Sequence, residues 1–455
     1  MSASVRVKKM LLAVFLGRGV MAVRQLLMVP LLIRFWGTEY YGEWLVVSAI
    51  PSFLAMSNLG LGTAASIQIG MDVSAGRNNQ AWTTFVSITL VLLAIVIGVW
   101  LLLLLSLFTF PGLLNEFTHL ENAKAVILVL VSATLTSLLS PTFTGWWVGV
   151  GKASRSSHWA NLKSFVELLV CLAIPWFGGK AVSLAIAMLV WNCAWLFAYA
   201  SATLVETRKL SFGSEFQFVE WQQVRVLLFK GLGHQLSPLW QAILFQGSIL
   251  LAAKLLGPSG AAMWGALRVA ARSGCQVLEL VSQSLRPEFQ IAAGVGDEGK
   301  LRRLHSIGVV VSIGIAICLA SVLLIVGRPL FLIWTRNAFV VDWMSWWLLM
   351  IALVPFSAWW VSGEMQRATN SPWFLNAAGV LIAVFSLVVM GSAAELGIAG
   401  FCIGMLFFEC LMACCIYTRS CRLLHDAPGD CFRRGVYEAG ALLSRFIVGW
   451  QRTGR

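Results

Sequence analysis

Charged side chains are scarce in this chain of 455 residues. Asp, Glu, Lys and Arg make up only 12% of it, whereas 59% of the residues are hydrophobic. A soluble domain carries about 25% charged residues. Half that charge, spread over this length, leaves too little polar surface to cover a water-soluble body. The composition therefore excludes a soluble globular protein and favours a membrane protein.

The alternating short strands of a membrane β-barrel are also missing. Continuous runs such as VLLAIVIGVWLLLLLSLF exclude that design. Apolar runs of about 20 residues, the length that crosses a bilayer as a helix, recur along the whole chain. About twelve of them are present, at roughly 10–35, 44–70, 83–109, 124–150, 159–178, 181–203, 232–256, 261–285, 305–333, 342–363, 373–390 and 396–418. The sequence predicts an all-α polytopic membrane protein, and the first run is expected to be a spanning helix rather than a signal peptide.

Cysteine and histidine show no pattern of a metal site. The ten cysteines lie mostly inside the predicted spans or near the C-terminal end, and none falls in a predicted outside loop. No Cys/His spacing along the chain matches a metal motif. We therefore expect no structural disulfide, no metal and no cofactor.

Acidic residues are fewer than basic ones, 20 against 33, which gives a net charge of +13. The basic residues concentrate in alternate loops and in the C-terminal segment, whereas the other loops hold little more than Lys124, Lys180 and Arg336. This asymmetry follows the positive-inside rule and predicts that both termini lie in the cytoplasm. The charge thus reports membrane topology, and we expect no nucleic-acid partner.

The spans form two groups of six around a polar segment. We expect an N-terminal bundle over 1–203, a cytoplasmic linker over 204–230, a C-terminal bundle over 231–418 and a basic cytoplasmic tail over 419–455. The halves are alike when the sequence is shifted by 220 residues: Gly37 falls on Gly257, Trp44 on Trp264 and Gly76 on Gly296. Parallel repeats of this kind enclose a cleft near the bilayer midplane in transporters that work by alternating access.

The first span carries arginines in its middle. At about 1.5 Å per residue, Arg18 lies roughly 12 Å and Arg24 roughly 21 Å from its cytoplasmic end. An arginine at the bilayer centre costs about 2.5–3.5 kcal/mol, and its charge cannot be lost. We expect Arg24 to line a polar cavity together with Arg18 and Gln25, the alternative being a structural bond to a neighbouring carbonyl group.

A second polar stripe lies in the segment GALRVAARSGCQVLELVSQSLRPEF. Arg268, Arg272, Glu279 and Arg286 follow one another at spacings of 4, 7 and 7, which places them on one helix face. We expect this stripe to face the cleft, and the alternative is an internal ion pair between Arg272 and Glu279.

The remaining polar groups of the spans are mostly neutral or paired. Gln241 and Gln246 are suited to hold substrate hydroxyl groups. Lys163 and Glu167 form a predicted i,i+4 pair. Glu409 is an intramembrane acid that either carries a proton or pairs with an arginine, and the sequence leaves both roles open.

The chain resembles the polysaccharide transporters, including the Wzx-type O-antigen flippases. The resemblance rests on an Arg-bearing first span that ends in LIRFWGTEYYGEW, followed by SNLGLGTAASIQI and the short loop AGRNNQ. These transporters belong to one superfamily with the lipid II flippase and the multidrug-and-toxin-extrusion antiporters. The spacing of Arg18 and Arg24 is similar to that on the first helix of the lipid II flippase, where arginines meet the diphosphate.

The resemblance implies a V-shaped bundle in a bacterial inner membrane that flips an isoprenoid-diphosphate-linked oligosaccharide to the outer leaflet. Its expected partners are that lipid, the membrane lipids and other polysaccharide-assembly membrane proteins. Permanent cations and glutamines suit the anionic head group independently of the resemblance. Two rival functions remain: a cation-coupled multidrug antiporter, which would be expected to show cavity acids, and a membrane-embedded polymerase or ligase, which would need a larger outside loop. We expect that the protein is not an enzyme.

Overall fold

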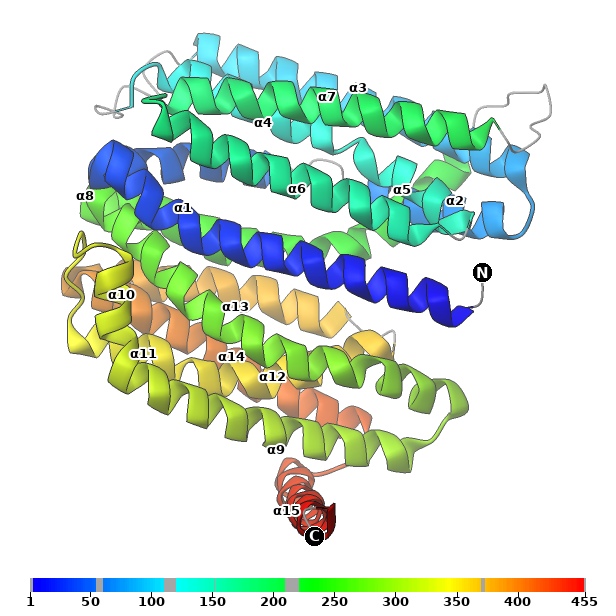
Figure 1. Cartoon of the computed structure of the whole chain (residues 1–455), viewed down its shortest axis with the longest axis vertical. Helices are drawn as coiled ribbons and strands as arrows, with labels where there is room; N and C mark the ends of the chain where they lie inside the picture. The colour runs from blue at the N-terminus through cyan, green and yellow to red at the C-terminus, as the bar shows by residue number, and fades with distance from the viewer. Residues whose placement is uncertain are drawn as a thin grey trace. The chain divides into compact units, whose positions relative to one another are not determined.

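The structure, a computed structural model, describes residues 3–54, 60–109, 120–150, 152–208, 221–369 and 373–453, and the regular secondary structure of these ranges is helical (Figure 1). The helices are α1 (Ala3–Leu54), α2 (Leu61–Ser74), α3 (Asn78–Thr109), α4 (Ala123–Ser137), α5 (Ser140–Gly149), α6 (Ala153–Trp176), α7 (Ala181–Thr207), α8 (Trp221–Val295), α9 (Glu298–Val322), the π-helical turn η3 (Leu323–Gly327), α10 (Arg328–Trp334), α11 (Trp343–Ile351), α12 (Leu353–Ala368), α13 (Trp373–Ser392), the 3₁₀ turn η4 (Ala394–Leu396), α14 (Ile398–Leu423) and α15 (Pro428–Thr453).

Ten helical segments of the described chain are long and apolar enough to cross a membrane. Two of these segments, in α1 and α8, each consist of two helices joined at a kink. When both kinked segments are counted as helix pairs, the structure agrees with the prediction of about twelve spans. The protein has an all-α polytopic membrane fold.

The two kinks occur at equivalent positions of the sequence repeat. Gly37 has φ 77° and ψ 171°, and Gly257 has φ 75° and ψ 179°. Only glycine occupies this region of backbone space without strain. The second glycine pair of the repeat, Gly76 and Gly296, also has positive φ, at 76° and 72°. The predicted repeat is therefore confirmed at both glycine pairs by nearly identical backbone geometry.

The chain divides into two compact units. The first comprises residues 1–242 and 257–262, and the second comprises 243–256 and 263–455. In the first unit α1 packs on α6 and α4, α2 packs on α5 and α3, and α7 packs on α4 and α6. In the second unit α14 packs on α11, α12 and α13, and α9 packs on α12. The segment expected to be a linker, 204–230, includes the end of α7 and the beginning of α8, and the predicted domain boundaries stay predictions.

A buried cluster in the first unit combines aromatic with aliphatic side chains. Trp146, Trp147 and Trp195 are almost completely buried with Tyr199 among the aliphatic side chains of α2 and α3. The indole of Trp147 donates a hydrogen bond to Thr203 at 2.9 Å, which satisfies its polar edge within the core.

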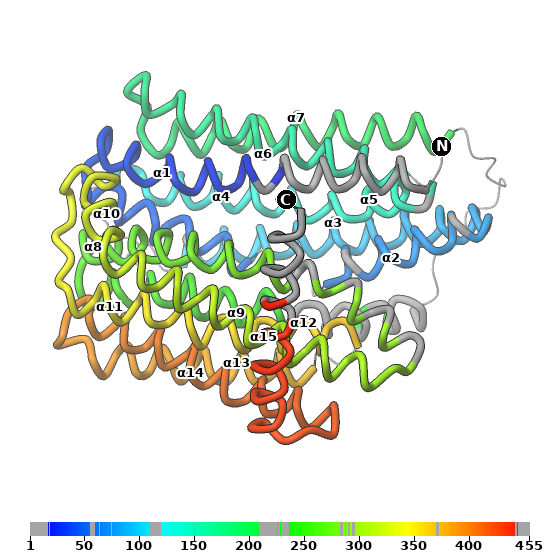
Figure 2. Tube along the Cα trace, turned by 60° about the horizontal axis from the view of Figure 1, so that its bottom comes forward, coloured from blue at the N-terminus to red at the C-terminus, as the bar shows by residue number. Residues whose placement is uncertain are grey.

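The last helix differs in direction from the spans of the second unit. Figure 1 shows α15 end-on while α9 and α14 are seen from the side, and Figure 2 shows α15 in the foreground, running crosswise to them. Its close contact is with α9, which it meets near the Glu298 end of that helix. The segment expected to be a tail thus contains a helix packed on the bundle.

Candidate functional site

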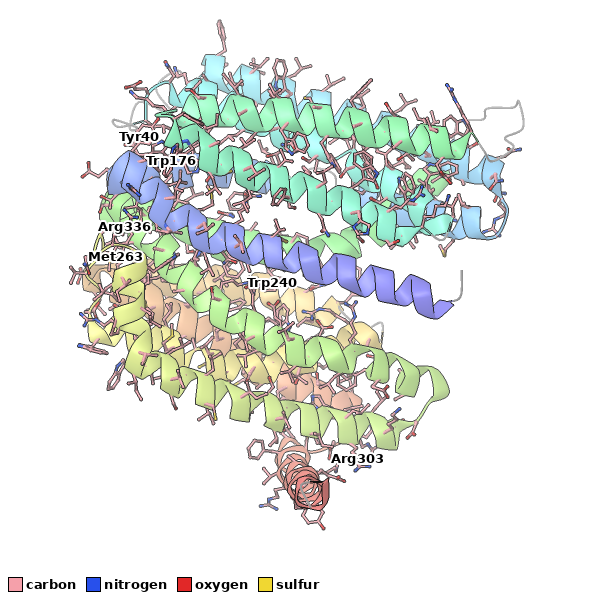
Figure 3. All side chains as sticks on the ribbon, viewed as in Figure 1. Tyr40, Trp176, Trp240, Met263, Arg303 and Arg336 are labelled. Carbon is pink, nitrogen blue, oxygen red and sulfur yellow. The ribbon has the colours of Figure 1, made fainter. Side chains whose placement is uncertain are left out.

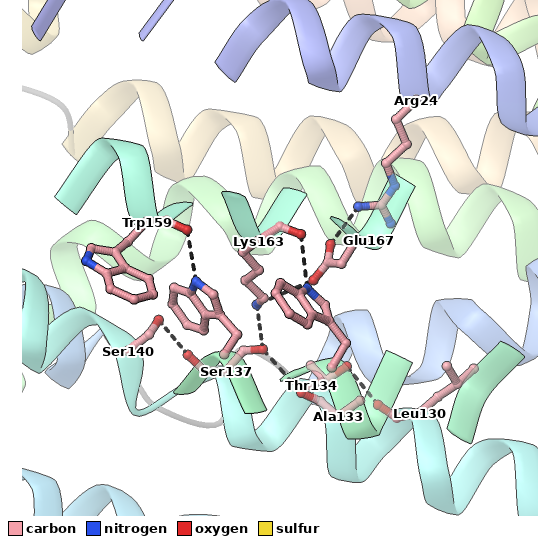
Figure 4. Close-up of polar contacts among 11 residues, drawn as sticks. Arg24, Leu130, Ala133, Thr134, Ser137, Ser140, Trp159, Lys163 and Glu167 are labelled. Carbon is pink, nitrogen blue, oxygen red and sulfur yellow. Dashed lines mark hydrogen bonds and ion pairs between the residues drawn. The ribbon is translucent and has the colours of Figure 1, made fainter. Parts of the chain in front are cut away.

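Arg24 forms an ion pair that the sequence did not reveal. Its Nη1 lies 2.8 Å from Glu167 Oε2, and this contact joins α1 to α6 within the first unit (Figure 4). The Arg24 side chain is 35% exposed, whereas that of Glu167 is 12% exposed. Arg24 therefore has a carboxylate partner, and its side chain remains partly exposed.

Lys163 shares this carboxylate. Its Nζ lies 3.7 Å from the other oxygen of Glu167, as the i,i+4 spacing predicted, and donates a hydrogen bond to Ser137 at 2.9 Å. The ammonium group also lies 5.1 Å from the centre of the Trp195 ring. Two cations thus flank one carboxylate, and the Glu167 cluster (Arg24, Lys163, Glu167) has one positive charge in excess.

The stripe of α8 has the predicted helical spacing, and its members are engaged with protein groups. Arg272 pairs with Glu279 at 2.7 Å, which was the alternative considered for this stripe. Arg268 donates a hydrogen bond to the backbone carbonyl of Phe245, and its guanidinium group lies 5.3 Å from the centre of the Phe245 ring. This contact connects the two helices of α8 on either side of the kink. The Arg272 side chain remains 35% exposed, like that of Arg24.

A second cluster with two cations and one carboxylate lies in the second unit. Glu364 on α12 accepts a hydrogen bond from Arg367 Nη1 at 2.6 Å and lies 3.7 Å from Nε of Arg286, the last residue of the stripe. Arg367 also lies 4.8 Å from the centre of the Trp360 ring. The Glu364 cluster (Arg286, Glu364, Arg367) has the same charge balance as the Glu167 cluster. Glu364 and Glu167 are the residues that sequence reasoning missed as partners of the arginines.

Glu409 is buried at 4% exposure in the second unit. It accepts a hydrogen bond of 2.6 Å from the indole of Trp359, which is itself fully buried. The structure thus gives Glu409 a neutral hydrogen-bond donor as its contact partner.

The remaining predicted site residues have less defined positions. Gln241 donates to Ser237 one helical turn away at 3.4 Å, and Gln25 and Gln246 are partly exposed. The side chain of Arg18 lies outside the described part of the chain. The substrate-binding role of all eight residues stays a prediction, and the structure places Arg24 and Arg272 in accessible ion pairs.

A cavity of about 640 Å³ lies at one end of α6 and α7. Aromatic and charged side chains line it, among them Trp147, Trp159, Arg155 and Glu206. Glu206 is paired there with Lys152. None of the described predicted site residues lines this cavity. Figure 3 shows the opposite end of the first unit, where Tyr40 and Trp176 gather and a smaller cavity of about 260 Å³ lies.

The fold of this chain is similar to the folds of several solved transporters. The chain superposes on an inward-facing multidrug resistance MATE family transporter of the MOP superfamily with a TM-score of 0.66 and 15% identity, over 89% of this chain and 98% of that one. The fold is that of MATE transporters. It is similarly close to MATE in complex with MaL6, with a TM-score of 0.67, 16% identity and coverage of 92% and 96%. The Vibrio cholerae MATE transporter VcmN in the bent form superposes with a TM-score of 0.60 and 17% identity, over 93% of this chain and 98% of that one.

The sequence itself has no comparable match. No protein-family model and no curated protein matches the chain. Identities of 15–17% show the MATE fold and do not extend to the subfamily or the transported molecule. The MATE fold agrees with the superfamily implied by the sequence resemblance.

Proposed function

We propose that this protein is a membrane transporter that flips an isoprenoid-diphosphate-linked oligosaccharide from the cytoplasmic to the outer leaflet by alternating access. The observation that carries the proposal is the charge balance of the Glu167 and Glu364 clusters. Each holds two cations against one carboxylate, the Glu167 cluster within the expected spans and the Glu364 cluster at the end of them. An excess of cations in the spans favours an anionic substrate.

The chemistry of the head group fits these residues. Guanidinium groups bind phosphate oxygens bidentately and remain charged in a poorly hydrated site. The Arg24 and Arg272 side chains are each 35% exposed, and in this proposal they contact such oxygens while they keep their carboxylate partners. Gln25, Gln241 and Gln246 supply neutral donors and acceptors for sugar hydroxyl groups. The isoprenoid chain remains among the membrane lipids.

The direction of transport requires a defined topology. The proposal places both termini in the cytoplasm of a bacterium and the protein in its inner membrane. There it works with other membrane proteins of polysaccharide assembly, which make its substrate and consume its product.

Removal of the protein tests this function in the cell. In a strain lacking it, the lipid-linked oligosaccharide should accumulate on the inner leaflet and surface polysaccharide should fall. The wild-type gene should restore export, whereas Arg24→Ala should not at equal protein level. Arg34→Ala is the matched control, because Arg34 lies on the same helix, is exposed and stacks only on the neighbouring Phe35 in the contacts described. Unchanged lipid intermediates in the deletion strain would contradict the proposal.

A cation-coupled multidrug antiporter is the second candidate. The MATE fold of the solved relatives favours it equally, and buried Glu409 is the acid that such coupling could use. This function predicts that deletion raises sensitivity to cationic dyes and drugs and leaves lipid-linked intermediates unchanged. Measuring both in the same strains separates the two candidates.

A further inference from the structure

We propose that His305, Cys421 and Cys431 form a zinc-binding site that fastens α15 to the bundle. The three residues come from α9, α14 and α15, and their ligand atoms all lie within 4.8 Å of one another. All three are at most 1% exposed. The sequence analysis expected no metal because His305 and Cys431 are 126 positions apart, so no motif spacing links them.

The distance between Cys431 and His305 fits a tetrahedral metal. Zinc binds thiolate sulfur at about 2.3 Å and imidazole nitrogen at about 2.0–2.1 Å, so two such ligands lie about 3.5–3.8 Å from each other. Cys431 Sγ lies 3.5 Å from His305 Nδ1. Two thiolates and one imidazole form a soft donor set that selects zinc over magnesium or calcium. The described part of the chain supplies three ligands to this group, which leaves a fourth position to be filled.

The hydrogen bonds of His305 leave the required nitrogen available. Ser362 Oγ donates to the carbonyl of Ala358 at 2.9 Å, so the same oxygen accepts from His305 Nε2–H at 3.0 Å. This assignment places the ring proton on Nε2 and the lone pair of Nδ1 towards Cys431. Metal-binding histidines are oriented in the same way by an acceptor at their second nitrogen.

The backbone of α15 approaches α9 closely enough to bring the ligands together. A Cβ atom at Gly435 would lie 2.3 Å from the carbonyl oxygen of Ser306, so only glycine permits this crossing. Gly435 is one helical turn beyond Cys431, and Ser306 follows His305. Arg303, at the same end of α9 (Figure 3), pairs with Glu438 of α15 at 2.9 Å.

The site gives α15 a ligand-dependent attachment. Because its ligands come from three helices and are buried, zinc binding stabilises the docked helix, and loading requires α15 to move away from α9. Binding releases the thiol protons, since both cysteines coordinate as thiolates. The inference is independent of the transported substrate.

Metal binding by the full-length protein in detergent tests this site. Under reducing conditions we expect one zinc per chain by mass spectrometry. Cobalt(II) in the same protein should give the thiolate charge-transfer and d–d bands of a tetrahedral sulfur-containing site. Cys421→Ser, Cys431→Ser and His305→Ala should lose tight binding, and Ser362→Ala should weaken it about 10- to 100-fold. Cys414→Ser is the control, because Cys414 is exposed on the same helix as Cys421.

A second measurement keeps the test independent of variant folding. In the wild-type protein, zinc should protect the connection between α14 and α15 from protease, and a chelator should reverse this protection. Absence of cobalt–thiolate bands in the wild type would overturn the proposal. So would a Cys421–Cys431 disulfide in the isolated protein, or equal zinc content in the wild type and the Cys431→Ser variant.

Discussion

The Glu167 cluster allows the structural and the substrate-binding roles of Arg24 to be separated by a double-mutant cycle. The variants are Arg24→Gln, Glu167→Gln and both together. At 2.8 Å and an effective dielectric constant of about 20, the Coulomb attraction of the pair is about 6 kcal/mol. Desolvation of both groups and the 35% exposure of Arg24 reduce the net value. We expect a coupling free energy of about 1–3 kcal/mol.

The two single variants should differ in stability. Arg24→Gln leaves Glu167 with Lys163, so the carboxylate keeps one partner. Glu167→Gln leaves Arg24 and Lys163 close together without their shared carboxylate, and should be the less stable of the two. The double variant should lose less stability than the two single variants lose when their losses are added. Thermal unfolding in detergent, followed by tryptophan fluorescence, measures this for each protein beside Arg34→Gln as the control.

Measurements of export distinguish the substrate-binding role of Arg24 from its structural role, which measurements of stability alone do not. If Arg24 counterbalances a diphosphate, export of surface polysaccharide should be low in Arg24→Gln and should stay low in the more stable double variant. Arg24→Lys should export at an intermediate level, because lysine keeps the charge but lacks the bidentate fork. Arg24→Glu should be the least active, since it repels phosphate. Recovery of export in the double variant would refute the reasoning, because Arg24 would then serve only to neutralise Glu167.

Three further outcomes are expected. Gly37→Ala and Gly257→Ala should each destabilise the protein by about 1–3 kcal/mol, because alanine is strained at their φ and ψ. The control Gly19→Ala should not destabilise it, because the space around Gly19 is open. Equal unfolding temperatures of the three variants and the wild type would contradict this. Trp359→Phe should destabilise by about 1–3 kcal/mol by leaving the Glu409 carboxyl group without its 2.6 Å donor, and Glu409→Met, which removes the acceptor, should suppress the effect; additive effects would speak against this contact. Reporter fusions at Glu206 and after Arg434 should read cytoplasmic and one at Gly178 outside, and the reverse pattern would refute the topology.

The spans and the repeat were predictable because their signals are local. A run of about 20 apolar residues identifies a spanning helix without knowledge of its neighbours. The glycine pairs of the repeat were visible as matches 220 positions apart, and the structure shows why glycine stands at Gly37 and Gly257: both adopt positive φ at an abrupt turn between helices. The spacing within α8 likewise indicated the pair of Arg272 and Glu279 as one of two alternatives.

The partners of the arginines on other helices could not be predicted in the same way. Arg24 and Glu167 are 143 positions apart, and the pairing depends on how α1 packs against α6. The sequence placed Glu167 in an i,i+4 pair with Lys163 and went no further. The pairing of Arg286 with Glu364 was unpredictable for the same reason. So was the grouping of His305 with Cys421 and Cys431. Polar contacts between helices follow from tertiary packing, which a single sequence with hydropathy alone does not specify.

Pairing of the arginines with carboxylates is compatible with transport of an anion. An arginine at the bilayer centre without any partner is costly by about 2.5–3.5 kcal/mol and would hold a phosphate tightly. A shared carboxylate lowers the cost of the empty state and competes with the phosphate for the same guanidinium group. A transporter must release its substrate as well as bind it, so the ratio of two cations to one carboxylate is suited to alternate between a protein anion and a travelling one. In the proposed function, the excess charge indicated by the sequence and the ion pairs in the structure are two parts of one mechanism.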